Sequence, residues 1–276
     1  MGKSKAKITN WTKYNRSLWQ RGNVTFWVDD SAVKSWKCTT HQGKRGRGFQ
    51  YSDTAIETAL MIKGIFSLSL RDLQGFIDSI FKLMDVPLTS PDYTCISKRS
   101  KTVQVRYRNK SKGRIRHIAI DSTGLKVFGE GEWKVKKHGN EKRRTWREVL
   151  PTLLNPLRRK IDSVSGNGAY DTKECNKVLQ RKGITPLIPP RKNAGFWDNG
   201  HPRNEAAKAL KSDTLAQWKI NSGYHDYSLS ETAMSRYKGP TSGQLSLRNY
   251  NAQVGEELAN VKAMNKIIGL GMPIRS

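Results

Sequence analysis

Three ionisable side chains are placed where they could carry out chemistry. Asp121 follows the alternating apolar run Ile115–Ile120, whose β-branched residues favour a strand, so its carboxylate lies at a strand exit. A carboxylate there suits a metal ligand or an acid–base group. Glu231 and Lys238 are seven residues apart, two turns along one face of an expected helix, so both can reach one site. The ordinary alternatives are an Asx turn at Asp121 and two surface charges on the helix.

The positive charge of the chain is its dominant compositional feature. The 276 residues carry 50 Lys and Arg against 23 Asp and Glu, a formal net charge of +27 at pH 7. Such a charge repels itself unless a polyanion shares it, so nucleic acid is the first-choice partner. A membrane partner would require a long apolar span, a basic amphipathic helix or a lipidation signal, and the sequence shows none of them. The first residues also lack a signal-peptide core, and we therefore expect a cytoplasmic protein without a membrane partner.

Hydrophobic and cysteine content place the chain among folded proteins without a disulfide framework. Hydrophobic residues make up 36% of a chain long enough to bury a sizeable core. Cys38, Cys95 and Cys175 are far apart and odd in number, which argues against disulfides and against a zinc site of the CxxC type. Cys38 with His41 offers two ligand types but lacks the second pair that a tetrahedral site needs.

Residues 1–50 are predicted to form a basic aromatic arm. Lys and Arg alternate there with Trp, Tyr and Phe, and the range ends in a flexible basic loop at 43–48. Cations for phosphates beside rings that stack on bases fit an arm that binds nucleic acid. The alternative is that the rings anchor the arm to the body of the protein.

Residues 51–112 are predicted to form a helical region that binds DNA. Apolar spacing indicates helices over 53–63, ended by Gly64, and over 70–84, followed by a short helix that starts with Pro91. Two apolar helices before a short basic one are typical of a helix-turn-helix reader, although any small helical bundle gives similar spacing. The cations that we expect to contact DNA are Lys98, Arg99, Lys101, Arg106, Arg108, Lys134, Lys136, Lys142, Arg143 and Arg144.

Residues 113–276 are predicted to form an α/β core with a helix at the C-terminus. After the strand that ends at Asp121 we expect a hairpin over 125–137. Further expected elements are a strand at 161–165, a helix over 172–183, a strand over 184–190, a helix after Ser228 and a final helix over 254–268. Residues 191–223 are polar and poorly periodic. Alternating strands and helices indicate an α/β fold class.

Four motifs, in this order, resemble the DDE transposases of bacterial insertion sequences. They are Ile-Asp-Ser-Thr-Gly at 120–124, Gly-Asn-Gly-Ala-Tyr-Asp at 166–171, Leu-Ile-Pro-Pro-Arg-Lys at 187–192 and a Tyr…Glu…Lys helix at 224–238. The resemblance covers nearly the whole chain. It implies a ribonuclease-H-like catalytic core behind a helical DNA-binding region. It also implies partners in double-stranded DNA, at element ends and at the target, an oligomer on that DNA, and a bacterial, nucleoid-associated location.

The resemblance also implies the chemistry. In the family two Asp and one Glu hold two Mg²⁺, or Mn²⁺, that activate water and then a DNA 3′-hydroxyl to cut and join strands. By the match, Asp121 is the first carboxylate and Glu231 the third. Tyr224 and Lys238 match the outer members of the Tyr-Arg-Glu-Lys helix signature, in which the Lys would hold a phosphate. Two hard cations need several charged oxygen ligands, so each carboxylate matters.

Three departures from the family pattern bear on activity. Asn167 stands where the family has its second Asp, and an amide oxygen can coordinate but carries no charge. Asp162 and Asp171 are nearby carboxylates whose use would change the geometry of the site. Tyr227 stands where the signature has Arg. The chain also passes from Arg147 directly to residues 148–150, where the family continues with another strand, and an incomplete sheet exposes edges.

These departures imply an internally deleted or degenerate copy. The leading interpretation is a transposase that binds element ends, cleaves and transfers strands with Mg²⁺ at Asp121, Asn167 and Glu231, and is impaired in this copy. The alternative is a catalytically dead DNA-binding derivative that acts as a repressor or relic. A general RNA-binding protein would fit the charge but gives no reason for the order of the motifs.

Overall fold

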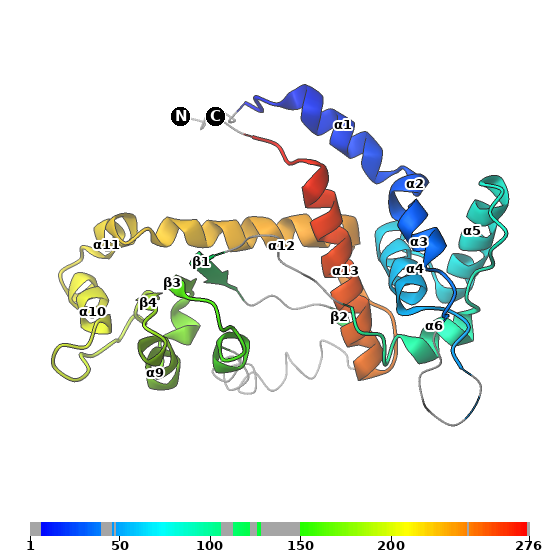
Figure 1. Cartoon of the computed structure of the whole chain (residues 1–276). Coiled ribbons are helices and arrows are strands. Elements are labelled where there is room, and N and C mark those ends of the chain that lie inside the picture. The colour runs from blue at the N-terminus through cyan, green and yellow to red at the C-terminus, as the bar shows by residue number, and fades with distance from the viewer. Residues whose placement is uncertain are drawn as a thin grey trace. The chain divides into compact units, whose positions relative to one another are not determined.

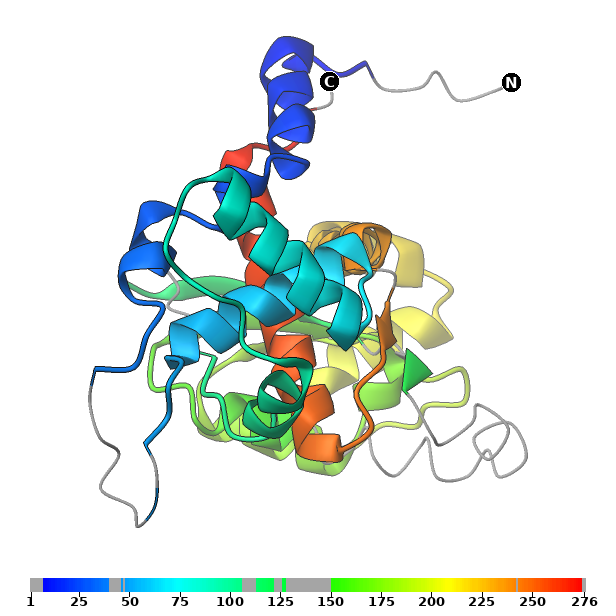
Figure 2. The same ribbon diagram turned by 90° about the vertical axis from the view of Figure 1, so that its right-hand side faces the viewer.

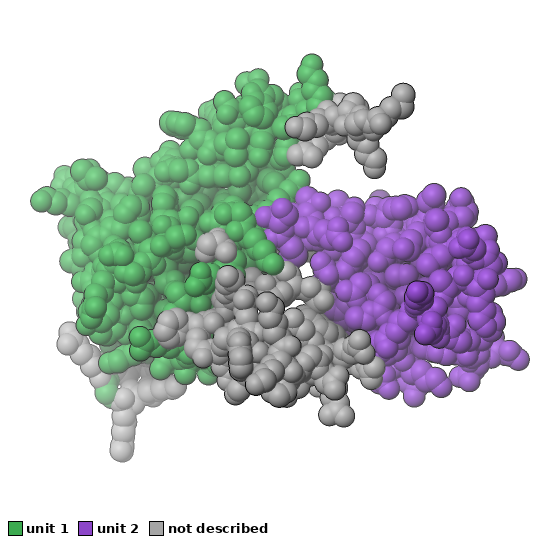
Figure 3. Space-filling model, turned by 180° about the vertical axis from the view of Figure 1, so that it is seen from behind, with its two compact units in different colours: residues 1–107, 125–129, 236–276 green, residues 108–124, 130–235 purple. Residues whose placement is uncertain are grey.

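The computed structural model describes residues 7–39, 46, 48–105, 113–121, 126–127, 150–241 and 243–274, with 126–127 described by backbone alone. These residues fall into two compact units, which Figure 3 colours separately. Unit 1 is drawn from residues 1–107, 125–129 and 236–276. Unit 2 is drawn from residues 108–124 and 130–235. Each unit therefore joins segments that are distant in sequence.

Unit 1 is built mainly from helices whose starts are set by polar side chains. A backbone N–H near the helix start is accepted by the side chains of Asn23, Asp29, Ser52, Ser69, Asp92 and Asn249. Each bond satisfies one of the donors that a helix start leaves unpaired. The helices, drawn in Figure 1, are α1 (Trp11–Arg21), α2 (Val24–Trp27), α3 (Asp30–Lys34), α4 (Asp53–Phe66), α5 (Leu70–Leu83), α6 (Tyr93–Arg99) and α13 (Tyr250–Leu270).

Helix α4 is the central helix of unit 1. Its residues from Ala55 to Lys63 are all buried, which is typical of a helix that is covered on every side. The helices that contact it are α2, α3, α5, α6 and α13, and α13 can be followed beside it in Figure 2. The N-terminal and C-terminal parts of the chain therefore share one hydrophobic core.

The described part of the arm predicted at residues 1–50 contains three helices and is partly buried. Trp27 and Trp36 are among the largest fully buried side chains of the chain, at 1% and 0% exposure. These two rings anchor the segment to the body of the protein, which was the alternative to base stacking. They are not exposed for stacking on bases. Trp11 and Trp19 of α1 are exposed. The base-stacking hypothesis is therefore confined to α1.

Two glycines let α13 pack closely against its neighbours. A Cβ on Gly64 of α4 would lie 1.9 Å from Oδ1 of Asn260, and a Cβ on Gly255 of α13 would lie 2.3 Å from the backbone oxygen of Ser100. The expected end of the helix at Gly64 is wrong, because α4 continues to Phe66. Tertiary burial outweighs the low helix propensity of glycine at this position.

Replacing Gly255 with alanine is expected to destabilise unit 1 by about 1–3 kcal/mol, the usual cost of overpacking, since the new methyl group overlaps the backbone of Ser100. The matched control is Gly75→Ala in α5, where an added Cβ meets nothing within 4 Å. That change should stabilise the helix by about 0.5–1 kcal/mol. Thermal unfolding measures both, and shifts of the same sign would contradict the close approach at Gly255.

Unit 2 contains a three-stranded parallel sheet in the order β1-β3-β4. Its strands are β1 (Ile115–Ile120), β3 (Ile161–Gly166) and β4 (Thr185–Leu187). Helix α9 (Lys173–Arg181) connects β3 to β4, as parallel neighbours require, and packs Leu179 against Val164 in the core. The strand, helix and strand expected over 161–190 are confirmed, and with them a mixed α/β architecture.

Two helices of unit 2 lie in the segment that the sequence analysis left without structure. They are α10 (Arg203–Lys211) and α11 (Leu215–Asn221). Neither has a capping side chain that bonds its first turn, so the usual start signals are weak. The segment then continues through the short 3₁₀ helix η2 (Tyr224–Tyr227) into α12 (Ser228–Thr241), which confirms the helix expected after Ser228.

The predicted hairpin over 125–137 is only partly within the described residues. Strand β2 (Lys126–Val127) pairs in parallel with β5 (Gln244–Leu245) of unit 1, and the return strand of the hairpin lies outside the described residues. Within the described sheet of unit 2, β1 is an edge strand.

Packing divides the chain differently from the domains expected over 1–50, 51–112 and 113–276. Because α13 packs along α4, residues 236–276 group with the N-terminal helices and not with the sheet. Lys63 and Glu256 form a buried ion pair between the two helices, which joins these distant segments. No helix among the described residues is long and apolar enough to span a membrane.

Candidate active site

The carboxyl ends of β1 and β3 bring two of the predicted site residues together. In the parallel register Ile120 is opposite Gly166. The next residues along the two strands, Asp121 and Asn167, therefore leave the sheet side by side at the same edge. The carboxyl edge of a parallel sheet is where ligands of α/β proteins commonly bind.

Asn167 occupies a tight turn that its own side chain helps to hold. Its Oδ1 accepts the backbone N–H of Ala169 at 2.9 Å, at the start of the 3₁₀ helix η1 (Gly168–Tyr170). A Cβ on Gly166 would lie 2.9 Å from the ring of Tyr170. The glycine before Asn167 therefore leaves the space that this buried ring occupies. An aspartate at position 167 could accept the same N–H, so the turn itself does not require an amide.

Tyr227 donates its hydroxyl hydrogen to Oδ1 of Asp121 at 2.7 Å. Tyr227 is buried, and its ring stacks on that of Tyr224 with the centroids 5.4 Å apart and an angle of 11° between the planes. Burial raises the pKa of Tyr227 above its ordinary value, and the bond to Asp121 raises it further. Tyr227 thus holds the carboxylate of Asp121 as a neutral donor.

Tyr224 and Glu231 lie in the same neighbourhood. Burial raises the pKa of Tyr224, and the negative charges of Glu231 and Asp121 add to this effect. Glu231 is exposed in the first turn of α12, and its charge also raises the pKa of Tyr227. Two carboxylates, an amide and two stacked tyrosines therefore form the described part of the candidate site.

Lys238 lies seven residues beyond Glu231, in the last turn of α12. That end of the helix belongs to unit 1, where the side chain of Lys238 lies close to Gly243. The helix confirms the expected two-turn spacing between the acid and the base. The role of Lys238 in holding a phosphate stays a prediction.

The two carboxylates that could replace Asn167 are already paired with arginines. Asp171 is buried and accepts two bonds from the guanidinium of Arg203, at 2.9 and 2.7 Å. Arg203 also lies 4.4 Å from the ring centre of Trp197, so it is fixed on a second side. Asp162 pairs with Arg114 at 3.4 Å near the surface. Asp171 is therefore part of the framework of unit 2.

Comparison with protein families agrees with this arrangement. Residues 19–130 match one family model and residues 147–241 match another, and each model is described as a transposase DDE domain. These matches support a DDE transposase. Together they extend across both compact units. No solved structure matches the chain.

The described residues do not fit the pair of divalent ions that a DDE transposase typically uses. No group of three or more His, Cys, Asp and Glu side chains within the described ranges could share a metal ion. The candidate site offers the carboxylates of Asp121 and Glu231 and the neutral amide of Asn167. Two charged ligands would leave half of the charge of two Mg²⁺ uncompensated.

The cations expected to contact DNA fall into three groups: exposed, buried, and outside the described residues. Lys98 and Lys101 are exposed at the end of α6. The expectation that Arg99 contacts DNA is corrected by the structure. Its guanidinium is buried, donates to the backbone oxygen of Tyr51 and pairs with Asp53. It holds α6 to α4 and is not presented to a phosphate. The others lie outside the described residues: Arg106, Arg108, Lys134, Lys136, Lys142, Arg143 and Arg144.

Sequence reasoning missed two side chains that shape the site. Tyr227 was recognised only as a departure from the signature, and its bond to Asp121 joins residues 106 positions apart. Arg203 stands in the segment considered poorly periodic, and no sequence signal linked it to Asp171. The only indication in the sequence was that position 227 falls within the resembled helix signature and departs from it.

Replacing Tyr227 with phenylalanine is expected to lower the free energy of unfolding by about 1 kcal/mol at pH 8, the net value of one hydrogen bond. A tyrosine whose pKa is raised on folding contributes stability that is complete below its unfolded pKa of about 10 and is lost as the pH rises through its folded pKa. The difference between the native protein and Tyr227→Phe should therefore shrink above pH 10. Denaturant unfolding at pH 8 and at higher pH measures it.

The control for Tyr227→Phe is Tyr250→Phe, because Tyr250 is 76% exposed. That variant should unfold like the native protein at every pH. A constant difference between the native protein and Tyr227→Phe across this pH range would contradict the raised pKa.

Replacing Asp171 with asparagine is expected to destabilise unit 2 by about 3–5 kcal/mol, because it leaves the charge of Arg203 buried without a partner. The matched control is Asp162→Asn, which breaks an exposed pair and should cost at most about 1 kcal/mol. Thermal unfolding measures both variants. An unchanged melting temperature in Asp171→Asn would contradict the framework role and make Asp171 a possible substitute for Asn167 in the site.

Proposed function

We propose that this chain is a transposase-type protein that binds double-stranded DNA at the ends of its element, and that strand cleavage and transfer are impaired in it. The observation that carries the proposal is that Asp121 and Asn167 directly follow Ile120 and Gly166, which are opposite each other at the carboxyl ends of β1 and β3. The family resemblance predicts a carboxylate at both positions, and Asn167 provides a neutral amide at the second.

The DNA-binding part of the proposal rests on charge and on the family matches. A net charge of +27 favours a polyanionic partner, and Lys98 and Lys101 are exposed on a capped helix that follows two apolar ones. Target DNA, an oligomer on DNA, a bacterial insertion sequence and a nucleoid location are proposed by resemblance alone.

The catalytic part assigns roles in the same way. Asp121, Asn167 and Glu231 are the proposed counterparts of the three family ligands, with Tyr224 and Lys238 as the outer members of the helix signature. The parallel order β1-β3-β4 supports a ribonuclease-H-like core, and β1 is its edge within the described sheet. A competent family member uses Mg²⁺ or Mn²⁺, and the neutral Asn167 is the proposed cause of impairment.

A second candidate function is a DNA-binding derivative without catalysis, which would repress intact copies by occupying element ends. Two contacts favour it. Asp121 already accepts the hydroxyl of Tyr227, and Asp171 is fixed by Arg203, so neither carboxylate compensates for Asn167. The two functions differ only in cleavage and share the same DNA affinity.

The first test measures DNA binding and nicking by the native protein. A labelled duplex that carries the DNA flanking this gene is compared with a scrambled duplex of equal length, with Mg²⁺ or Mn²⁺. Tighter binding to the flanking duplex, with cuts that are weak or missing, would support the proposal. Efficient metal-dependent cuts at the element end would overturn the impairment, and equal binding to both duplexes would overturn the recognition of element ends.

Replacing Asn167 with aspartate is expected to raise cleavage strongly, by ten-fold or more, while DNA affinity stays nearly unchanged. The new carboxylate adds the missing charge, and it can still accept the N–H of Ala169. Nicking assays compare Asn167→Asp with the double variant Asp121→Ala, Asn167→Asp, which should lose the gain.

A thermal shift gives a second readout for Asn167→Asp. Ligands that bind only the folded state raise its melting temperature, so Mg²⁺ should stabilise Asn167→Asp more than the native protein. No difference in shift and no gain in cleavage would show that the neutral side chain is not the cause of impairment.

A further inference from the structure

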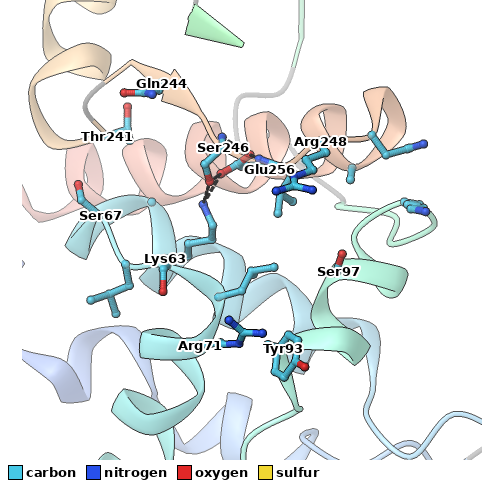
Figure 4. Close-up of a pocket in the computed structure, with 18 residues that line it drawn as sticks. Lys63, Ser67, Arg71, Tyr93, Ser97, Thr241, Gln244, Ser246, Arg248 and Glu256 are labelled. Atoms are coloured by element: carbon cyan, nitrogen blue, oxygen red, sulfur yellow. Dashed lines mark hydrogen bonds and ion pairs between the residues drawn. The ribbon is translucent and has the colours of Figure 1, made fainter. Parts of the chain in front are cut away.

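Unit 1 contains a cavity of about 830 Å³ that the candidate active site does not use. Its walls come from the connection between α4 and α5, from α6, and from the segment 244–249 with the start of α13 (Figure 4). Every lining residue belongs to unit 1. We call it the α5–α6–α13 cavity.

The cations of this cavity outnumber its acids. Arg71, Lys101 and Arg248 line it and are exposed. The one carboxylate in the lining is that of Glu256, which is paired with the buried ammonium of Lys63. No ion pair of Arg71 or Lys101 with this carboxylate is found among the described residues.

Glu256 is directed inward by several bonds besides the ion pair. Its carboxylate accepts the backbone N–H groups of Ser246 and Leu247, both at 3.0 Å, and the hydroxyl of Ser246 at 3.2 Å. These bonds, drawn in part in Figure 4, hold the segment before α13 against α13 itself, and the bond of Lys63 to Ser246 joins that segment to α4. The acid thus builds the floor of the cavity and does not repel an anion at its mouth.

Arg71 is positioned for planar recognition of an anion. Its guanidinium lies 4.8 Å from the ring centre of Tyr93, and Figure 4 shows the two side chains together on one wall. A guanidinium that stacks on a ring keeps its N–H groups in plane, where they match two oxygens of a phosphate. The cation is therefore held in place without an acid.

Polar groups of the walls add further donors. Ser67 and Ser97 line the cavity, and Ser69 begins α5, whose first backbone N–H groups have no partner within the helix. Helix α13 likewise begins at Asn249 in the lining. Hydroxyls and helix starts assist cations in binding phosphate, although here the three cations are the principal feature.

We propose that the α5–α6–α13 cavity seats a phosphate of the DNA backbone, with Arg71, Lys101 and Arg248 as its cationic contacts. The inference rests on the proposed DNA binding and says where on unit 1 one of the DNA contacts lies. Tyr93 and Ser97 lie one turn apart on α6, and Lys101 follows the end of this helix, so the cavity continues into the exposed side of α6. A backbone that crosses α6 can therefore place one phosphate in the cavity.

The test measures how the affinity for a labelled duplex depends on KCl concentration in the native protein, Arg71→Gln and Arg248→Gln. One phosphate contact contributes about 0.9 to the slope of log K against log salt, so each variant should lose a part of that amount. The control is Lys82→Gln, an exposed cation of α5 outside the cavity, which should keep the native slope. Thermal unfolding confirms that each variant is folded.

Ser97→Asp provides an independent variant, because it adds a negative charge to the cavity wall and removes no contact of the core. It should weaken DNA binding several-fold at low salt. Native slopes in Arg71→Gln and Arg248→Gln, or native affinity in Ser97→Asp, would overturn the inference while leaving the proposed function intact. A native protein that fails to bind duplex DNA would overturn the proposed function first.

Calorimetry with inorganic phosphate and with a deoxynucleoside triphosphate separates a backbone phosphate from a small ligand. We expect neither to bind tightly, because each lacks the contacts of the duplex with α6. Micromolar binding of the triphosphate, lost in Arg71→Gln, would overturn the DNA assignment and make the cavity a nucleotide site.

Discussion

The parallel pairing of β1 with β3 is the constraint on which the candidate site depends. Because Ile120 lies opposite Gly166, the residues that follow must leave the sheet as neighbours. No flexible segment has to fold back to bring Asp121 and Asn167 together. The buried ring of Tyr170 and the bond from Asn167 to Ala169 then fix the turn after β3. The position of Asp121 beside Asn167 is therefore a property of the sheet.

Three acids of this chain neutralise cations that are buried in the protein. Glu256 pairs with Lys63, and Asp171 pairs with Arg203, both at buried positions where an unpaired charge would be costly. Asp53 pairs with the buried Arg99. Because these charges cancel in pairs, the formal net charge of +27 comes from the other ionisable side chains.

Local signals predicted much of the fold, and long-range contacts were beyond them. Ser69 and the apolar spacing after it predicted α5, and the turn at Asn167 followed a recognisable strand. The continuation of α4 through Gly64 could not be predicted, because it depends on Asn260 of a distant helix. The burial of Arg99 and the bond of Tyr227 to Asp121 could not be predicted for the same reason. In each case the partner is far along the chain, and spacing within one segment carries no information about it.

The ion pair of Lys63 with Glu256 has a consequence for the way the protein is made. Residues 63 and 256 are 193 positions apart, so the ribosome releases α4 long before α13 exists to cover it. The sheet of unit 2 is encoded between them and is complete earlier. Contacts of such high sequence separation fold slowly, and an apolar helix that waits for its partner exposes surface prone to aggregation. Nascent chains that stop before residue 250 would leave exposed the face of α4 that α13 covers, while α2, α3, α5 and α6 could already pack on its other faces.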